Sequence, residues 1–454
     1  MIIGRNNELN QLGTYYNRDK SQIIVLYGQK YIGKTALLKE FMTDKPGFYY
    51  LCEPASEREQ KFRLGLFLGE LGIKTLRFPE FSDVLTATSK KHSQKKVIVF
   101  DEFQNLIKSC PSFMDELISF IHSSWNNQEY LVILSSSSVG FVENNLVSKI
   151  GEAAFELSGF LKIKELSFYD LREYFSLYTN EDCAICYSIL GGVPGLWEMF
   201  DKKASVKENI TKKILYKNGP LHNVAKTIVE DELRETGVYN TILSSLSGGK
   251  LKLNDLYEQT GFSRAKISVY IKNLMELELV EKVFSIDTDG RDNAQKGIYN
   301  ISNKFVDFYY SFLFKYSSFL EFNSPEEFYR MYVLPSLKSY VGKYYRQICL
   351  EYMEKANQRK KLPIVCERFS KWVGKQGTID IVAMGENEKN ILAICVYDKA
   401  MLTYEDYEWL LYCANKAKLN ADYIYLFAGG RFDEKLSLEA KVRKNLKLFL
   451  LDNI

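Results

Sequence analysis

The chain has 454 residues, 46% hydrophobic and 26% charged, which is typical of a globular protein of about two to four domains. Its net charge of +3 is too small to indicate a nucleic-acid partner, and no apolar run approaches the ~20 residues that span a bilayer. The eight cysteines include one CxxC pair, Cys183 and Cys186, without the further ligands of a zinc site, so we expect a reduced cytoplasmic location and no membrane contact.

Residues 1–165 alternate apolar runs of strand type with segments of helical periodicity. This alternation predicts an α/β domain built on a mostly parallel sheet. The predicted strands are Gln22–Tyr27, Gly47–Cys52, Lys96–Phe100 and Tyr130–Leu134, and the predicted helices are Lys34–Phe41, Arg58–Leu71 and Phe113–Ser123.

A glycine-rich motif joins the first predicted strand to the first predicted helix. Residues 28–35 read GQKYIGKT and fit the pattern GxxxxGK[ST] of a phosphate-binding loop (P-loop). In such a loop, backbone N–H groups at a helix N-terminus cradle the phosphates, the lysine reaches the β- and γ-phosphates, and the hydroxyl binds Mg²⁺. A chance match is the alternative, but the strand before the motif and the helix after it favour an ATP site. The residues expected to bind ATP are Gly28, Lys30, Ile32, Gly33, Lys34, Thr35 and Ala36, with Lys34 also assisting catalysis and Thr35 also binding the metal.

An acidic pair ends the third predicted strand. The run KVIVF at residues 96–100 predicts a buried central strand, and Asp101 and Glu102 follow at its carboxyl end, where open α/β sheets bind ligands. We expect Asp101 to support Mg²⁺ and Glu102 to orient or deprotonate the water that attacks the γ-phosphate. A solvated acid at an ordinary strand end is the alternative.

A run of four serines, residues 135–138, follows the fourth predicted strand. A hydroxyl at that strand end can contact the γ-phosphate or the attacking water, and we assign this catalytic role to Ser137. A plain serine-rich turn is the alternative.

The pattern turns helical from Ser167, and residues 166–233 are predicted to form a helical lid. Residues 234–304 then read as the helices Gly237–Leu246, Lys252–Gln259 and Arg264–Glu276, followed by the strands Leu279–Ser285 and Ile298–Ile301. Helix, turn, helix and hairpin is the order of a winged helix. Basic residues on its third helix (Arg264, Lys266 and Lys272) allow DNA contact, whereas the acidic residues close by favour a packing module.

Residues 305–454 begin with an aromatic-rich linker and continue as a further α/β domain. Its predicted elements are a helix Tyr332–Lys355, a hairpin of Thr378–Met384 with Ile391–Tyr397, a helix Tyr404–Ala417 and a strand Tyr423–Ala428. We expect the aromatic cluster to pack between domains, with a partner surface as the alternative.

Together these motifs resemble the archaeal-type P-loop ATPases of the AAA+/STAND group, which carry a winged helix and a C-terminal domain of restriction-endonuclease type. The similarity covers essentially the whole chain. It rests on Ile3-Gly4-Arg5-x-x-Glu8-Leu9, Val99–Gln104, the serine run, Gly191-Gly192-Val193-Pro194, Phe308–Phe312 and Tyr340-Val341-Gly342. The resemblance implies that Arg5 lies near the adenine base, that Ser137 is a sensor and that residues 191–195 belong to the lid.

The sequence departs from the family pattern in two places. Members usually carry an arginine soon after the sensor strand, whereas the nearest cation here is Lys149 and the first arginine is Arg172. A lysine lacks the bidentate fork of arginine, so we expect slow turnover or an arginine supplied by a partner.

The second departure lies in the C-terminal domain. A nuclease of this type needs an Asp on one strand and E-x-K on the next. Asp380 stands at the first position, but Cys395 and Tyr397 replace the acid and the lysine, and Arg346 stands where a helical carboxylate would help. We therefore expect a degenerate endonuclease-like domain.

The leading hypothesis is an ATP- and Mg²⁺-binding conformational switch that hydrolyses ATP slowly. A non-hydrolysing DNA-binding regulator is the main alternative, and a Mg²⁺-dependent nuclease is the weakest. DNA, a second copy of the chain or another protein are the partners left open.

Overall fold

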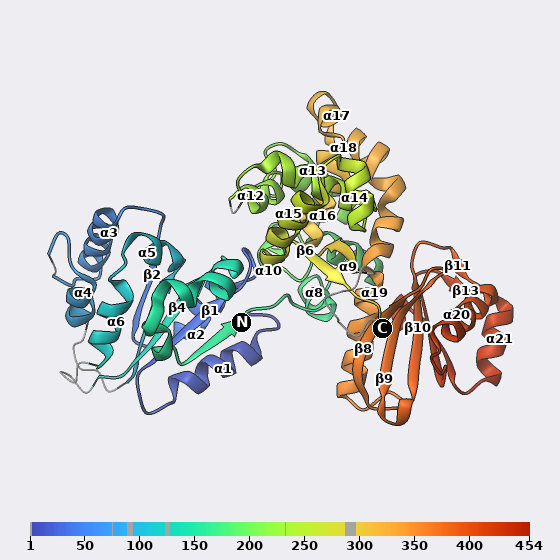
Figure 1. Cartoon of the computed structure of the whole chain (residues 1–454), viewed down its shortest axis with the longest axis horizontal. Helices are drawn as coiled ribbons and strands as arrows, with labels where there is room; N and C mark the ends of the chain where they lie inside the picture. The colour runs from blue at the N-terminus through green and yellow to red at the C-terminus, as the bar shows by residue number, and fades with distance from the viewer. Residues whose placement is uncertain (1, 75, 89–93, 123–127, 232, 287–296) are drawn as a thin grey trace. The chain divides into compact units, whose positions relative to one another are not determined.

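A computed structural model describes residues 2–74, 76–88, 94–122, 128–231, 233–286 and 297–454 (Figure 1). The chain divides into two compact units. The first comprises residues 1–166 with 193–195, and the second comprises residues 167–192 with 196–454.

The first unit contains a five-stranded parallel sheet of order β2-β3-β4-β1-β5. Its strands are β1 (Gln22–Tyr27), β2 (Gly47–Leu51), β3 (Lys96–Asp101), β4 (Tyr130–Ser136) and β5 (Gly159–Lys162). The four predicted strands are confirmed. The sequence did not reveal β5, because this edge strand has four residues and only one of them, Leu161, is buried.

The helices of the first unit pack on both faces of this sheet. They are α1 (Asn6–Tyr16), α2 (Lys34–Met42), α3 (Glu57–Glu70), α4 (Phe81–Thr88), α5 (Gln104–Ser109), α6 (Phe113–His122) and α7 (Leu146–Ile150), with a π-helical segment Phe141–Asn145 and a 3₁₀ segment Gly151–Glu156. The three predicted helices are confirmed as α2, α3 and α6, and Ser123, predicted to end the last of them, lies outside the described residues.

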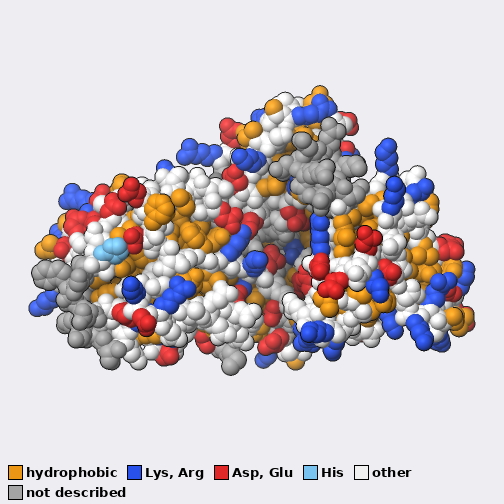
Figure 2. All heavy atoms as spheres, turned by 60° about the horizontal axis from the view of Figure 1, so that its bottom comes forward, with side chains coloured by type: hydrophobic (Ala, Val, Ile, Leu, Met, Phe, Trp, Pro, Cys, Tyr) orange, Lys and Arg blue, Asp and Glu red, His pale blue; other side chains and the backbone are white. Residues whose placement is uncertain are grey.

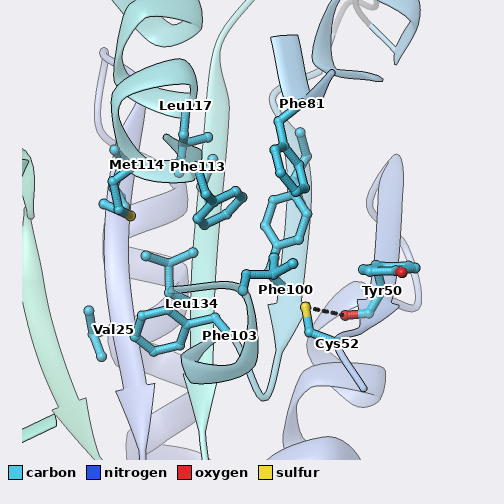
Figure 3. Packing of buried hydrophobic residues seen from close by; sticks show 14 of the residues in the cluster. Val25, Tyr50, Cys52, Phe81, Phe100, Phe103, Phe113, Met114, Leu117 and Leu134 are labelled. Atoms are coloured by element: carbon cyan, nitrogen blue, oxygen red, sulfur yellow. Dashed lines mark hydrogen bonds between the residues drawn. The ribbon is translucent and has the colours of Figure 1, made fainter. Parts of the chain in front are cut away.

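Aromatic side chains fill the core between the sheet and helices α3 to α6. The ring of Phe113 meets Phe81 at 4.9 Å and Phe100 at 5.1 Å, both edge to face, a favoured arrangement of aromatic rings (Figure 3). Leu134 and Phe103 extend this cluster towards the carboxyl ends of the strands. The packing fixes β3 and β4, and so fixes the residues that follow them.

The second unit begins with helices α8 (Phe168–Tyr174), α9 (Asn180–Leu190), α11 (Val206–Asn209) and α12 (Val224–Glu230), and a π-helical segment Ile210–Leu215 extends α11. The short α10 (Pro194–Trp197) spans the boundary, since its first two residues belong to the first unit. Capping boxes start α8 and α9, in which Ser167 and Thr179 exchange hydrogen bonds with Asp170 and Asp182. Cys183 and Cys186 are buried in α9 as free thiols.

A winged-helix arrangement follows, as predicted. It consists of α13 (Thr236–Ser247), α14 (Leu253–Thr260), α15 (Arg264–Glu276) and the antiparallel pair β6 (Val280–Val283) and β7 (Ile298–Ile301). The aromatic segment then forms α16 (Lys304–Phe308), α17 (Ser317–Phe322) and α18 (Pro325–Phe328), with π-helical segments Tyr309–Phe314 and Tyr329–Val333. Most of the aromatic cluster is buried, including Phe305, Phe308 and Tyr310, as expected for core packing.

The C-terminal part is a second five-stranded sheet of order β14-β12-β10-β9-β8. Its strands are β8 (Cys366–Val373), β9 (Thr378–Gly385), β10 (Asn390–Val396), β12 (Tyr423–Ala428) and β14 (Leu446–Leu450), beside a small pair β11 (Met401–Leu402) and β13 (Arg431–Phe432) and 3₁₀ turns Glu386–Glu388 and Leu451–Asn453. The predicted hairpin is confirmed as β9 with β10, which pair antiparallel.

Helices cover the two faces of this second sheet. The long α19 (Leu334–Gln358) lies on one face, and α20 (Tyr404–Ala417) and α21 (Glu434–Val442) lie on the other (Figure 1). The sequence did not reveal β8 and β14, because β8 is largely polar and each of the two strands has few fully buried residues.

Charged side chains of both signs are interspersed over the face drawn in Figure 2, in keeping with the small net charge. Among the described residues, no helix combines the length and the hydropathy that crossing a membrane requires.

Candidate nucleotide site

The phosphate-loop motif forms a turn between β1 and α2. Gly33 has φ +95° and Tyr31 has φ +65°, so the backbone passes twice through the left-handed region before the helix begins. The amide N–H groups of Lys34, Thr35 and Ala36 have no backbone acceptor within the described residues, because they form the first turn of α2. These donors are free to meet an anion, which is the property that a phosphate cradle needs.

The Lys34 side chain lies inside the loop and is only 6% exposed. Its Nζ donates to the carbonyl oxygens of Gly28 at 2.8 Å and Gln29 at 3.2 Å. Burial lowers the pKa of the Lys34 ammonium, while the nearby Glu102 and Asp101 act in the opposite direction. A buried cation held only by neutral carbonyls is poised to gain from a phosphate, since an anion restores the stabilisation that water no longer gives.

The other predicted loop residues surround this lysine. Gly28 follows β1, and its N–H donates to the Ser136 carbonyl of the neighbouring β4 at 3.3 Å. Lys30 is half-buried, Ile32 is fully buried, and the Thr35 and Ala36 residues are exposed at the start of α2.

Asp101 ends β3 and is 3% exposed. Its Oδ2 accepts from the Thr35 hydroxyl at 3.4 Å and from the Tyr49 hydroxyl, and its Oδ1 accepts from the Glu102 N–H at 3.0 Å. A carboxylate and a hydroxyl that converge in this way are hard oxygen donors of the kind Mg²⁺ takes. The residues present therefore fit a magnesium ion held by Thr35 and Asp101.

Glu102 adopts φ +54°, which is uncommon for a side chain with a Cβ and turns the carboxylate away from the strand. Its Oε2 accepts from the Ser137 N–H at 3.2 Å, the Ser137 hydroxyl at 2.7 Å and the Gln104 amide at 2.5 Å. The structure thus brings together the acid and the serine that the sequence placed on different strands. Three donors on one oxygen hold the Glu102 carboxylate in one orientation.

Arg5 lies behind the loop and is 2% exposed. Its guanidinium donates to the Ile32 carbonyl, the Lys164 carbonyl and the Glu8 carboxylate, each at 2.8 Å. These bonds tie the N-terminal segment, the phosphate loop and the chain after β5 into one assembly. The described contacts are those of a positioning residue, and the adenine contact implied by the family resemblance stays a prediction.

Replacing Arg5 by alanine is expected to destabilise the first unit by about 3 kcal/mol, because the buried Ile32 carbonyl and the part-buried Lys164 carbonyl lose a charged donor. In calorimetry, Mg·ATP should shift the transition of the unit that binds it, and we expect the melting temperature of that transition to fall by roughly 6–12 °C in the variant. Arg18→Ala removes an exposed arginine of the same unit and serves as the control. An Arg5→Ala protein that keeps its melting temperature but loses ATP affinity would instead support the adenine contact.

One contributor was missed in the sequence. Tyr49 reaches Asp101 because β2 pairs with β3, and no local residue pattern predicts that pairing. Pro194 and Gly195, which the sequence places in a lid expected to close over the phosphates, lie on the phosphate loop, since the Gly195 N–H donates to the Tyr31 carbonyl at 2.9 Å. A side chain at Gly195 would bring its Cβ to 2.8 Å from that carbonyl oxygen, so this contact requires glycine.

In the C-terminal sheet, Asp380 does not face a second strand acid. Its Oδ2 accepts from the Cys395 N–H at 2.9 Å, and the Arg346 guanidinium donates to its carbonyl oxygen at 2.5 Å. Burial raises the pKa of Asp380, while the Cys395 N–H and the nearby Lys371 oppose that shift. The nearby acid on the helix that carries Arg346 is Glu351. Its carboxylate accepts hydrogen bonds from the Phe168 N–H at 2.7 Å and from the Tyr187 hydroxyl.

Comparison with known proteins agrees with this organisation. Residues 2–200 match the family described as an ATPase domain predominantly from Archaea, residues 240–282 match bacterial regulatory proteins of the arsR family, and residues 309–404 match a family of archaeal and bacterial proteins of unknown function. An uncharacterized protein of Methanocaldococcus jannaschii is 24% identical over 397 residues, which cover 87% of each chain.

Two further proteins are similar to parts of the chain. An uncharacterized ATP-binding protein of Methanocaldococcus jannaschii is 40% identical over 45 residues, which are 10% of this chain and 76% of that protein. The Walker-type ATPase of Pyrococcus abyssi aligns with 68% of this chain and 96% of its own, at 17% identity and a TM-score of 0.49.

The fold and the site define a nucleotide-binding protein of the P-loop ATPase class. Residues 2–200 match the ATPase domain found predominantly in Archaea, and an ArsR-type winged helix and a C-terminal sheet domain follow this ATPase domain.

Proposed function

We propose that the chain binds ATP with Mg²⁺, hydrolyses it slowly and uses the nucleotide to switch its conformation. One observation carries the proposal: Lys34 and Thr35 at the start of α2 lie beside Asp101 at the end of β3, with Glu102 and Ser137 joined next to them. These are the groups that bind a triphosphate, hold a metal and activate a water.

Binding is proposed to use the free amides of the first turn of α2 together with Lys34. When phosphate oxygens arrive, the Lys34 ammonium can exchange the carbonyls of Gly28 and Gln29 for a charged partner. Mg²⁺, when held by Thr35 and Asp101, would neutralise part of the charge on the phosphates. Tyr49 keeps the Asp101 carboxylate oriented through its hydroxyl.

Hydrolysis is proposed to depend on Glu102. As a water oxygen bonds to the γ-phosphorus and the bond to ADP breaks, the carboxylate accepts the proton that the water loses. In the described structure Ser137 and Gln104 occupy Oε2, so the base must turn or use its other oxygen. Lys149 is exposed on α7 and lacks the fork of an arginine, which supports slow turnover.

The switch is proposed to act through Pro194 and Gly195. These residues contact the phosphate loop, whereas the chain on either side of residues 193–195 belongs to the second unit. The Gly33 backbone also lies close to them, since a Cβ atom added at Gly33 would be 3.5 Å from the Pro194 ring. Any nucleotide that binds more tightly when this contact is made shifts the population towards that arrangement.

Steady-state release of phosphate from Mg·ATP tests the proposal. We expect slow release by the native chain and none above background when the Glu102 carboxylate is removed. Equal release by both proteins would contradict the enzymatic part, and the absence of both release and nucleotide binding would contradict the whole proposal.

A non-hydrolysing DNA-binding regulator is the second candidate, and the arsR-family match over residues 240–282 favours it. Arg264 and Lys266 are exposed at the start of α15, although Arg264 also donates to Asn254 at 2.5 Å and Lys272 pairs with Glu276 at 3.8 Å. Cations at this end of a recognition helix are placed to meet phosphates.

Replacing both Arg264 and Lys266 by alanine is expected to weaken binding to duplex DNA by about tenfold and to reduce the salt slope by about 2, because two phosphate contacts are lost. Fluorescence anisotropy of a labelled duplex at several salt concentrations measures both quantities. Lys416→Ala, an exposed lysine on α20, is the control. Unchanged affinity and slope would leave the winged helix as a packing module.

We do not propose a nuclease. The strand beside Asp380 carries Cys395 and Tyr397 in place of the acid and the lysine, and among the described residues no group of three or more His, Cys, Asp or Glu side chains is arranged to hold a metal.

A further inference from the structure

A second pocket, which we call the C-terminal pocket, lies in the second unit between the end of α19 and the edge of the C-terminal sheet. Its volume is about 550 Å³, within the range of small-molecule sites. Residues of α19 line one wall at helical spacing, with Tyr352, Lys355 and Arg359 on the same face. Strands β12 and β14 form the floor, where Tyr425 lies opposite Lys447 in the ladder.

The lining of this pocket is basic. Four cations contribute to it and no Asp or Glu side chain does among the described residues; the cations are Lys355, Arg359, Lys361 and Lys447. None of the four forms an ion pair with a described residue. Four cations around one concavity repel each other, and Asp170 and Glu351 offset this only near Lys355, so an anion bound among the cations lowers a repulsion that the empty pocket carries.

Lys355 is half-buried, whereas the other three cations of the lining are exposed. Its Nζ is 3.6 Å from the centre of the Tyr169 ring. Burial lowers the pKa of the Lys355 ammonium, and Arg359 adds to that shift, while Asp170 opposes it. Lys355 is therefore a partly desolvated cation at the wall of the pocket, where a bound anion would stabilise its charge.

Four aromatic residues also line the pocket, beside a few small and aliphatic ones; the aromatic residues are Tyr169, Tyr352, Tyr425 and Phe449. The rings of Tyr352 and Phe449 are 5.3 Å apart, and Phe427 stacks behind Phe449 at 4.9 Å. Tyr169, Tyr352 and Phe449 are half-buried, so part of each ring borders the open space. A planar base can stack on such rings, and each stacked base adds to affinity with little sequence preference.

We propose that the C-terminal pocket binds a nucleotide unit, with its base against the aromatic rings and its phosphate among the four cations. A nucleotide carries both a charged phosphate and a flat ring, so it matches both the cations and the aromatic rings of the lining. A purely anionic or a purely apolar ligand would match only one of these two sets. A free nucleotide and the end of a single-stranded nucleic acid share this chemistry. The site is separate from the phosphate loop, which lies in the first unit.

The test uses the full chain carrying Lys34→Ala, so that the phosphate loop is disabled and the result does not depend on the ATPase proposal. Isothermal titration with AMP and with a 5′-phosphorylated eight-residue oligothymidylate measures binding at low salt. Arg359→Gln, added to this background, is expected to weaken the ligand about tenfold, since one charge-assisted phosphate contact is lost. Lys441→Gln, on α21 and outside the pocket, is the matched control and should change nothing.

A second variant separates the base from the phosphate. Tyr352→Leu keeps apolar volume but removes a stacking ring, and it is expected to weaken AMP about tenfold while leaving pyrophosphate unchanged. Binding of AMP identifies a free nucleotide as the source, and binding of the oligonucleotide alone identifies a strand end. The proposal would be overturned if pyrophosphate bound as tightly as AMP. It would also be overturned if Arg359→Gln lowered the affinity for none of the probes.

Discussion

Replacing Lys34 by alanine is expected to weaken Mg·ATP binding on the order of 100-fold, about 3 kcal/mol, because the triphosphate loses its only buried cation in the loop. The backbone amides of α2 remain, so residual binding should persist at high nucleotide concentration. Isothermal titration gives the affinity directly. Thermal unfolding gives a second readout, since Mg·ATP should raise the melting temperature of the native chain and leave the variant nearly unmoved.

The control for this experiment is Lys39→Ala. Lys39 lies on the same helix, but it is exposed near the far end of α2, where no phosphate can reach it. The control protein should keep native affinity and the native thermal shift. Equal heats of binding for Lys34→Ala and the native chain would show that the loop does not hold the phosphates, and the nucleotide site would then have to be sought elsewhere.

Replacing Glu102 by glutamine is expected to lower the rate of phosphate release by about 100-fold or more while nucleotide affinity changes little, because the base is lost and the phosphate contacts stay. Glutamine has nearly the same shape, and its carbonyl oxygen can still accept from the Ser137 N–H and hydroxyl. The unusual backbone at residue 102, φ +54°, is also kept. A single-turnover assay with bound ATP separates this chemical step from product release.

Glu152→Gln is the matched control, since this exposed carboxylate belongs to the same unit and removes the same charge. Its phosphate release should equal that of the native chain. Loss of nucleotide affinity in Glu102→Gln would indicate that the carboxylate shapes the pocket rather than acting as a base. Retained turnover in the variant would show that Glu102 is not the base, whereas no release above background by the native chain would favour the non-hydrolysing regulator.

The strands and the phosphate site of the first unit were predictable because their signals are local. A buried parallel strand is a short apolar run, and the motif 28–35 carries its glycines, lysine and threonine at fixed spacing. Asp101 and Glu102 follow such a run directly, so their position at the carboxyl edge follows from the strand. The structure confirms these strands and places both acids beside the loop.

Edge elements were harder to predict for a physical reason. Strands β5, β8 and β14 lie at or near sheet edges and bury few residues, so their sequences show no clear alternation. What makes them strands is hydrogen bonding to a neighbour that is distant in sequence. The same holds for the C-terminal pocket, whose lining comes from α8, α19, β12 and β14.

By itself, the sequence determined that this chain carries a phosphate loop, an acidic strand end and a winged helix, because each is written in contiguous residues. Only the tertiary structure decided that Arg5 ties the loop to the chain after β5, that Tyr49 and Thr35 share one carboxylate, and that Ser137 bonds to Glu102. Each of these contacts joins residues from different elements. Their proximity is therefore set by strand order and packing, which local residue patterns do not encode.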